Sequence, residues 1–543
     1  TQKPESEVHA AIHPTDSNKM IAAVMRFENN PGTPLSFSLY NTSNFGQNWT
    51  ESTFRGEIPG NNVPAGGGDP VVAYESNGKV HFVWLLLTFN AGTQQGEIGI
   101  YHASSADNGF TWNKPSTPIY SGQLGVDPNT NQVFAVDRYV DKPWLAVDRS
   151  SVSSKDALYI AFYSLDLQPD TVPTIQILRK TKNAGTFSSS PVQVNSQTYQ
   201  DLQFASIDVG PDGVVHVVFW GSQNGEDYAL YHAKSENSGA SFLPETPIAG
   251  IAFPQPDSTG GFPPSNLPGV KRLYPCPQLK VDKTDGPRSG NLYLAWTAYG
   301  VSSQVSQGYD IYFSRSTDGG DSWSNPVIVN DDNNPDTHQF FPSLDVSPKG
   351  LLVLTWYDRR NDPQNMNTEY FMTWSVDGGL TFSDQFAVSD QSSDFGKIGD
   401  NNDGFGVGEY TQVITTAHQA IPFWADGREN NGRVRVYTGF VPLTEEPVVG
   451  IREWQTINPD FSLEMIYPNP AKEKIQIAWS QKRKMMIGGG IFDLGGKEMI
   501  HFAEKEFLPG NHRMEIRVSG LSAGIYLLKV LADGEIFVQR LKF

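Results

Sequence analysis

An eight-residue motif recurs along the chain, and this internal repeat constrains the possible folds more than any other feature. In each copy a turn-forming Asp or Asn is followed two residues later by Gly, and a large aromatic residue closes the motif. The copies cover residues 42–49, 105–112, 181–187, 235–242, 316–323 and 375–382, the third being shortened. Asp and Asn favour turns, and Gly readily adopts positive φ, so each copy predicts a tight hairpin.

The order of strands around the motif also repeats. Short apolar runs at 292–296, 311–314 and 327–329 surround one motif, and runs at 351–356 and 370–374 precede another. Such runs, separated by Gly, Pro and Asp, predict β-strands, and four strands per repeated unit are typical of a propeller. A seventh unit, Tyr410 to Val441, has the strands but no motif. The sequence therefore predicts an all-β fold with a seven-bladed β-propeller, or a six-bladed one if the first or last unit is irregular.

Composition excludes several classes of function. The 543 residues carry a formal charge of −19, which argues against a nucleic-acid ligand or an anionic membrane surface. Cys276 is the only cysteine, so an internal disulfide or a multi-cysteine metal site is excluded. The longest apolar stretch, 83–89, is far shorter than the roughly 20 residues of a membrane-spanning helix, so no transmembrane segment is expected.

The repeated motifs resemble the Asp boxes of sialidases and related β-propellers, and the resemblance covers residues 7–441. In that family the motif is structural and lies on the face opposite the active site. The resemblance therefore implies that Asp107, Asp318 and Asp377 shape hairpins and take no part in catalysis. It assigns residues 1–441 to the propeller.

The end of the chain predicts a second domain. A polar linker is expected at 442–463, followed by a small antiparallel β-sandwich at 464–543. Tyr-Pro-Asn-Pro at 467–470, the run at 523–530 and a basic final strand resemble the C-terminal sorting domain of type IX secretion cargo. The alternative is an ordinary immunoglobulin-like module.

The resemblance to sorting domains implies a cellular address. It implies a Bacteroidota-type bacterium and a signal peptide that once preceded Thr1. Export would then pass through the periplasm to the medium or the outer cell surface. The partner of residues 464–543 would be the type IX secretion machinery, and whether the domain is later cleaved stays open.

Arginines are expected at one face of the propeller. They either precede the innermost strands or follow the second strands, and loops at these places share a face. The substrate-binding candidates are Arg26, Arg138, Arg272, Arg359 and Arg428. Clustered guanidinium groups would suit a carboxylate or phosphate. The alternative is salt bridging between neighbouring blades, because Asp358-Arg359 and Asp426-Gly427-Arg428 occupy equivalent places.

The sialidase resemblance implies a catalytic set. Tyr410 or Tyr274 would be the nucleophile, Glu409 its partner and Asp69 the acid. Adjacent residues of a regular strand point to opposite sides, so Glu409 and Tyr410 are not both expected to face the axis. The family's Arg-Ile-Pro motif is missing from the first unit.

Metal binding is a further possibility. Oxygen-rich loops at 331–334 and 400–404 suggest Ca²⁺, although solvated turns are the alternative. His81 is equivalent to His216, and His102 to His232, in different repeats, so these histidines are interpreted as structural. No other cofactor is expected.

Together these features predict a secreted or cell-surface propeller directed at glycans, either a sialidase-like glycoside hydrolase or a relative. The alternative is a non-catalytic adhesin or structural component that binds a glycan or a protein. The identity of the glycan and the oligomeric state stay open.

Overall fold

The computed structural model describes most of the chain. The described residues are 4–26, 36–55, 62–90, 92–115, 117–127, 133–168, 171–252, 267, 270, 273–301, 304–332, 334, 336–398, 406–429, 431–444, 460–467, 473–492, 497–521, 525–533 and 535–542. The chain divides into two compact units, Thr1–Pro447 and Val448–Phe543.

The described residues of the first unit form seven antiparallel sheets. The first sheet comprises β1 (Glu5–Ile12), β2 (Met20–Arg26), β3 (Ser36–Thr42) and β4 (Thr50–Phe54). The second comprises β5 (Val63–Tyr74), β6 (Val80–Asn90), β7 (Gln95–Ser105), β8 (Tyr120–Val126) and β9 (Val133–Ala135). The third comprises β10 (Arg138–Val147), β11 (Leu158–Asp166), β12 (Thr174–Lys180) and β13 (Val192–Gln193). The fourth comprises β14 (Asp201–Val209), β15 (Val215–Ser222), β16 (Tyr228–Ser235) and β17 (Thr246–Ile251).

The remaining three sheets follow in chain order. The fifth comprises β18 (Gln278–Val281), β19 (Leu292–Val301), β20 (Gln304–Ser316) and β21 (Val327–Ile328). The sixth comprises β22 (Gln339–Val346), β23 (Leu352–Asp358), β24 (Asn367–Ser375), β25 (Phe386–Ala387) and β26 (Ser393–Asp394), with one 3₁₀ turn, η1 (Phe395–Lys397), after it. The seventh comprises β27 (Gln412–Thr415), β28 (Gln419–Asp426), β29 (Arg435–Thr438) and β30 (Val441–Pro442), and both β29 and β30 pair with β28.

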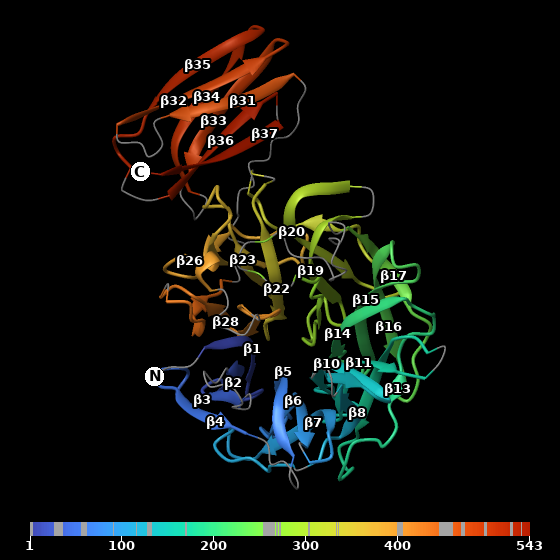
Figure 1. The fold of residues 1–543 in the computed structure, drawn as a ribbon. Helices are drawn as coiled ribbons and strands as arrows, with labels where there is room; N and C mark the ends of the chain where they lie inside the picture. The colour runs from blue at the N-terminus through green and yellow to red at the C-terminus, as the bar shows by residue number, and fades with distance from the viewer. Residues whose placement is uncertain are drawn as a thin grey trace. The chain divides into compact units, whose positions relative to one another are not determined.

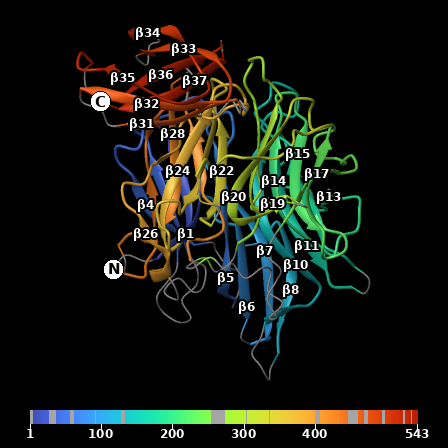
Figure 2. The same ribbon diagram turned by 90° about the horizontal axis from the view of Figure 1, so that it is seen from above.

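The first strand of every sheet contacts the first strand of the next, and β27 contacts β1, so the seven strands form a closed ring (Figure 1). In Figure 1 the later strands of a sheet lie farther from this centre, for example β2, β3 and β4 outside β1, and Figure 2 shows the strands side-on. The backbone N–H of Glu5 donates to the carbonyl of Val434 at 2.9 Å, which joins the first sheet to the last. The predicted all-β propeller is confirmed.

The repeated motifs form the turns between third and fourth strands, and their Asp side chains bond within them. In the second sheet the carboxylate of Asp107 accepts from the Ser105 hydroxyl at 2.7 Å and from the Thr111 N–H at 2.8 Å. Gly109 follows with φ of 83°, where a Cβ would lie 2.7 Å from Ile21 of the first sheet. These contacts explain why the motif needs both residues.

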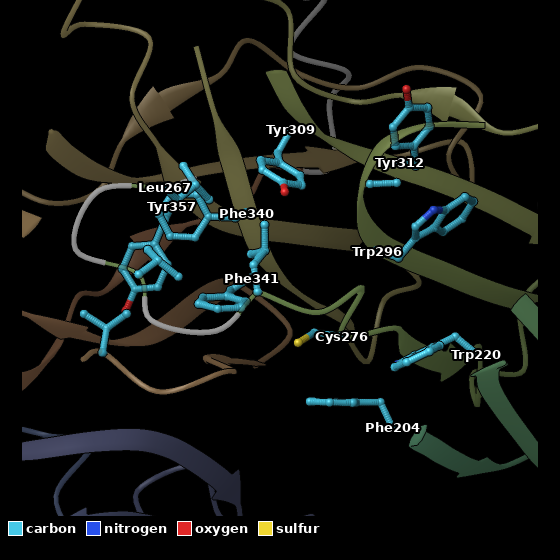
Figure 3. Close-up of a cluster of buried hydrophobic side chains, with 14 of the residues drawn as sticks. Phe204, Trp220, Leu267, Cys276, Trp296, Tyr309, Tyr312, Phe340, Phe341 and Tyr357 are labelled. Carbon is cyan, nitrogen blue, oxygen red and sulfur yellow. The ribbon is translucent and has the colours of Figure 1, made fainter. Parts of the chain in front are cut away.

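Neighbouring sheets pack through large aromatic side chains. Trp84, Trp220, Trp296 and Trp356, each in the second strand of its sheet, are completely buried, and Trp424 is 3% exposed. Figure 3 shows one such cluster, in which Trp220 and Trp296 lie near Phe204 and Cys276. The tryptophans are core residues.

Two pairs of histidines are buried at equivalent places in the second and fourth sheets. The Nδ1 of His81 lies 2.8 Å from the Nε2 of His102, and the Nδ1 of His216 lies 3.1 Å from the Nε2 of His232. Burial lowers the pKa of His216 to about 4 and that of His232 to about 3. Each pair is therefore uncharged near neutral pH and links β-strands within one sheet.

The His216–His232 pair predicts loss of stability in acid. In the unfolded chain these residues take up protons at the ordinary pKa of 6.5, whereas the folded chain keeps them neutral down to about pH 4. Stability is therefore present above pH 6.5 and is lost as pH falls, by about 3 kcal/mol for a histidine whose pKa is lowered to about 4. Denaturant unfolding between these limits should show a shallower pH dependence for the His216→Gln/His232→Gln double variant than for the wild type. Equal slopes would contradict the assignment.

The second unit is a β-sandwich of two sheets. One comprises β31 (Phe461–Tyr467), β32 (Lys474–Gln481) and β35 (Gly510–Arg517). The other comprises β34 (Glu498–Phe507), β33 (Met485–Phe492), β36 (Ile525–Ala532) and β37 (Glu535–Lys542). Its own core contains the buried Trp479, Ile491 and Leu528. Within the described residues of the whole chain, no helix has the length and apolar character needed to cross a membrane.

Candidate functional site

The first strand of most sheets contains a β-bulge, which changes the direction of one side chain. The pairing with the second strand shifts register near the start of β1, β5, β10, β14 and β22. At each bulge a residue other than Gly adopts positive φ, as does the residue two positions before β18. These residues are Glu7, Asp69, Lys142, Phe204, Cys276 and Phe341, with φ between 43° and 53°. A bulge bends the strand and redirects a side chain, so it brings these six together around the axis.

Four charged residues meet at this hub. The Nζ of Lys142 lies 2.8 Å from Oδ1 of Asp69 and 3.5 Å from Oε1 of Glu7, and it also pairs with Glu409. The side chains of Glu7 and Glu409 are each 2% exposed, that of Asp69 8% and that of Lys142 12%. One ammonium group thus neutralises part of a nearly buried set of three carboxylates.

The neighbouring Asp141 completes what we call the acid cluster: Glu7, Asp69, Asp141 and Glu409 around Lys142. Burial, followed by the negative charge of Asp69, raises the pKa of Asp141 to about 7. Burial also opposes the charge of Lys142, but the carboxylates of Asp69, Glu409 and Glu7 outweigh it and raise the pKa of Lys142 well above its ordinary value. The cluster therefore holds a protonatable carboxyl beside a fixed cation near neutral pH.

Aromatic rings surround the ammonium group. Lys142 Nζ lies 5.1 Å from the ring centre of Phe204 and 5.7 Å from that of Tyr410. The hydroxyl of Tyr410 donates to the carbonyl of Pro70 at 3.5 Å, and its ring packs edge-on against Trp144 at 5.3 Å. Burial and the charges of Glu7 and Asp69 raise the pKa of Tyr410 well above its ordinary value. Its surroundings therefore disfavour the phenolate that a tyrosine nucleophile needs.

Three of the four catalytic candidates come together. Asp69, Glu409 and Tyr410 lie around Lys142, whereas Tyr274 packs against Phe204 with ring centres 4.8 Å apart. The expectation that Glu409 and Tyr410 do not both face the axis applied only to a regular strand. The alternation of a regular strand does not apply, because β27 begins only at Gln412.

Glu7, Asp141 and Lys142 belong to the cluster but were not among the sequence candidates. A partial signal was present in the sequence, since a bulge residue is followed by proline in Asp69-Pro70, Lys142-Pro143, Cys276-Pro277 and Phe341-Pro342. Aligning these dipeptides would have placed Asp69 and Lys142 at equivalent positions.

The described arginine candidates are separately engaged. Arg26 donates to Glu51 at 2.9 Å within the first sheet, and Arg138 pairs with Asp166 at 2.5 Å within the third. Arg359 is buried, donates to Thr368 at 2.9 Å and lies 5.1 Å from the ring centre of Phe340. Arg272 lies outside the described residues. In the described part of the chain no arginine pairs with a carboxylate of the acid cluster.

Arg428 and Arg360 form salt bridges between neighbouring sheets, the alternative to a ligand-binding role. Arg428 pairs with Asp426 at 2.6 Å and with Asp390, which follows the outer strand β25 of the preceding sheet. Arg360 pairs equivalently with Asp358 at 2.7 Å and with Asp331 at 2.6 Å. These pairs join neighbouring sheets, and Arg360, not Arg359, is the counterpart of Arg428.

The loops considered for Ca²⁺ do not assemble a metal site in the described residues. There, no group of three or more His, Cys, Asp or Glu side chains is arranged to hold a metal ion. Asp331 is engaged by Arg360, and Asp332 accepts from the Thr337 hydroxyl at 2.6 Å. The loop at 400–404 lies outside the described residues.

Comparison with known families identifies the second unit. Residues 465–542 match the family described as the secretion system C-terminal sorting domain. The second unit is a secretion sorting domain. The predicted recognition of this domain is therefore confirmed, and a domain of this kind indicates export to the cell surface or the medium.

Solved structures similar to this chain share little of its sequence. A Hadza microbial sialidase has a TM-score of 0.42 at 12% identity, with 77% of this chain and 76% of that chain covered. An α-L-arabinanase of Penicillium chrysogenum has a TM-score of 0.41 at 16% identity, covering 65% and 92%. A Dyadobacter fermentans protein of unknown function has a TM-score of 0.40 at 12% identity, covering 66% and 91%. A search of curated proteins found no match.

Proposed function

We propose that this protein is an exported, glycan-directed propeller that hydrolyses glycosidic bonds with the carboxyl groups of the acid cluster. The observation that carries the proposal is the pKa of Asp141, raised to about 7 by burial and by the charge of Asp69. Hydrolysis of a glycoside by paired carboxyl groups requires one that is protonated and another that is ionised.

The residues divide these roles by environment. Asp141 is the general acid that protonates the leaving oxygen. Glu409 or Asp69, each paired with Lys142, is the carboxylate that activates water or attacks the sugar. Lys142 positions both groups. Tyr410 packs beneath them as a neutral phenol, so the mechanism differs from that of a sialidase with a tyrosine nucleophile.

The substrate we propose is a neutral glycan. Arg26, Arg138, Arg359 and Arg428 are each occupied by partners of their own, so they do not form the carboxylate clamp that a sialoside requires. The acid cluster itself would repel an anionic sugar.

We propose the cellular context from the sorting domain. Residues 1–441 are the working domain, 442–463 the linker and 464–543 the segment that engages the type IX secretion machinery. Export would take the chain through the periplasm of a Bacteroidota-type bacterium to its surface or beyond.

The proposal is tested with neutral aryl glycosides, arabinan and sialyllactose as substrates. Replacing Asp141→Asn should lower kcat by about 10²–10⁴-fold, because general acid catalysis contributes that much. Wild-type activity should decline as pH rises above about 7, where Asp141 loses its proton.

Two variants distinguish this mechanism from one that uses a tyrosine nucleophile. Tyr410→Phe should retain activity, whereas a tyrosine nucleophile would lose it. Asp137→Asn is the matched control, since Asp137 directly precedes β10, the strand that holds Asp141, but accepts from the Gln123 N–H at 2.6 Å. Turnover that needs Tyr410 and tolerates Asp141→Asn would overturn the proposal.

A second candidate is a non-catalytic surface protein that binds a glycan or a protein. The observation that favours it is the position of Lys142, whose ammonium group forms ion pairs with three carboxylates at once. Carboxylates held in these ion pairs are less available to react with a substrate. Glycan-array binding by the wild type without turnover of any glycoside would select this candidate.

A further inference from the structure

The hub also contains a cavity of about 880 Å³, separate from the acid cluster. Its walls are the later residues of the first strands and the turns that follow them, for example Asp16, Lys283 and Ser347. Phe45 of the first repeated motif also lines it, so it opens at the motif face of the propeller. His9 and Trp144 line the cavity, and Trp144 contacts Tyr410 of the hub on its other side.

The repeat explains why this end is hollow. Hydrogen bonds between adjacent first strands align their residues; for example, the Val281 N–H donates to Asp208 at 2.9 Å, and the Thr415 hydroxyl donates to Asp345 at 2.7 Å. Four positions after the bulge residues Glu7, Asp69 and Lys142 are Ala11, Ala73 and Ala146, all lining the cavity. Three small side chains in succession leave space that Asp208, Lys280 and Asp345 of the next three sheets do not fill.

The charged side chains that line the cavity are three acids, Asp16, Asp208 and Asp345, and three bases, Arg149, Lys280 and Lys283. Asp208 is engaged by Lys283 and by the Val281 N–H, and Asp345 lies 3.7 Å from the Nζ of Lys280. Arg149 has neither acid as a direct partner. At the rim, Asp16 pairs with Lys19 at 3.1 Å. This balance stands out in a chain of net charge −19.

Arg149 is the group that a ligand can still reach. One of its nitrogens donates to the carbonyl of Tyr74 at 3.3 Å. Among the described residues no carboxylate oxygen lies within 4.0 Å of it, and its side chain lines the cavity. A guanidinium group with unused donors in a concave site is suited to bidentate binding of a carboxylate.

We propose that this cavity binds a small organic carboxylate of the size of an acidic sugar. Arg149 holds the carboxylate, and Lys280 and Lys283 add positive charge beside it. The volume lies within the range of roughly 300–1,000 Å³ that is usual for small-molecule sites. The site uses residues that the proposed glycoside hydrolysis does not use, so the two proposals stand or fall separately.

Isothermal titration calorimetry of the full chain with D-glucuronate tests the site, with D-glucose and inorganic phosphate as comparisons. The wild type should bind glucuronate and not glucose. Arg149→Gln should weaken binding by about tenfold or more, the usual effect of losing a charge-assisted hydrogen bond. Arg315→Gln is the matched control, because Arg315, like Arg149, donates to a carbonyl from a neighbouring sheet, that of Gly378 at 3.1 Å, but does not line the cavity.

A second variant keeps the test decisive if Arg149→Gln fails to fold. Ala73→Leu places a larger side chain in the cavity and so reduces its volume without changing its charge. This variant should also weaken glucuronate binding, while its melting temperature stays that of the wild type. The proposal is overturned if wild-type protein does not bind glucuronate, or if both variants bind it like the wild type. Binding of phosphate but not glucuronate would overturn the assignment to carboxylates.

Discussion

Replacing Lys142→Met is expected to destabilise the propeller by about 3–5 kcal/mol near neutral pH. The substitution removes the only ammonium group that the Glu7, Asp69 and Glu409 carboxylates share in the described structure. Three nearly buried carboxylates would then lose the cation that they share at the centre of the ring, where seven strands converge. Denaturant unfolding followed by tryptophan fluorescence measures the loss.

The same variant should recover stability in mild acid. Without the cation, burial and mutual repulsion favour the uncharged form of these carboxyl groups in the folded chain. The folded state then binds more protons than the unfolded state, so stability increases as pH falls from about 7.5 to about 5. The wild type already contains one such group, Asp141, so the informative quantity is the difference between the two proteins.

Lys397→Met provides the matched control. Lys397 pairs with Asp394 at 3.2 Å, but its side chain is 56% exposed, so its loss should cost less than about 1 kcal/mol. If Lys142→Met were as mild as this control, the acid cluster would not need its central cation and the description of the hub would be wrong.

Deleting residues 464–543 is expected to abolish appearance of the protein at the cell surface while leaving the propeller folded. The chain divides between Pro447 and Val448, and the core around Trp479 contains only residues of the second unit. Each unit therefore has a core built from its own residues. Cell fractionation with immunoblotting should find the truncated chain in the periplasm, with unfolding behaviour like that of the intact propeller.

The matched experiment transfers residues 464–543 to a periplasmic reporter protein, which should then reach the surface. Efficient export of the truncated chain, or retention of the fused reporter in the periplasm, would contradict the role of the sorting domain. An unfolded truncated propeller would show that the two units depend on each other for stability.

Much of the fold was predictable because its signals are local. A motif such as 316–323 encodes its turn within eight residues, and its Asp and Gly act on their own backbone. The buried tryptophans follow the same rule, since Trp356 and Trp424 end apolar runs that are readable without neighbours.

The candidate site was predictable only in part. Asp69, Glu409 and Tyr410, which were named from the sequence, lie around Lys142 at the hub, and their catalytic roles stay a prediction. Whether the arginines gather to bind a ligand depends on which acidic partner each side chain reaches in the folded chain. Arg428 reaches Asp426 and Asp390, 38 residues earlier in the chain, and sequence position alone does not reveal that choice.

The sequence by itself determined the repeated hairpins, the all-β class and the sorting domain, because each depends on short patterns of residue type. Only the tertiary structure decided that Lys142 stands among the carboxylates and that three alanines leave a cavity beside Arg149. The physical reason is that bulges with positive φ turn these side chains away from the alternation of a strand, and closure of the ring then places distant charges within a few ångströms of one another.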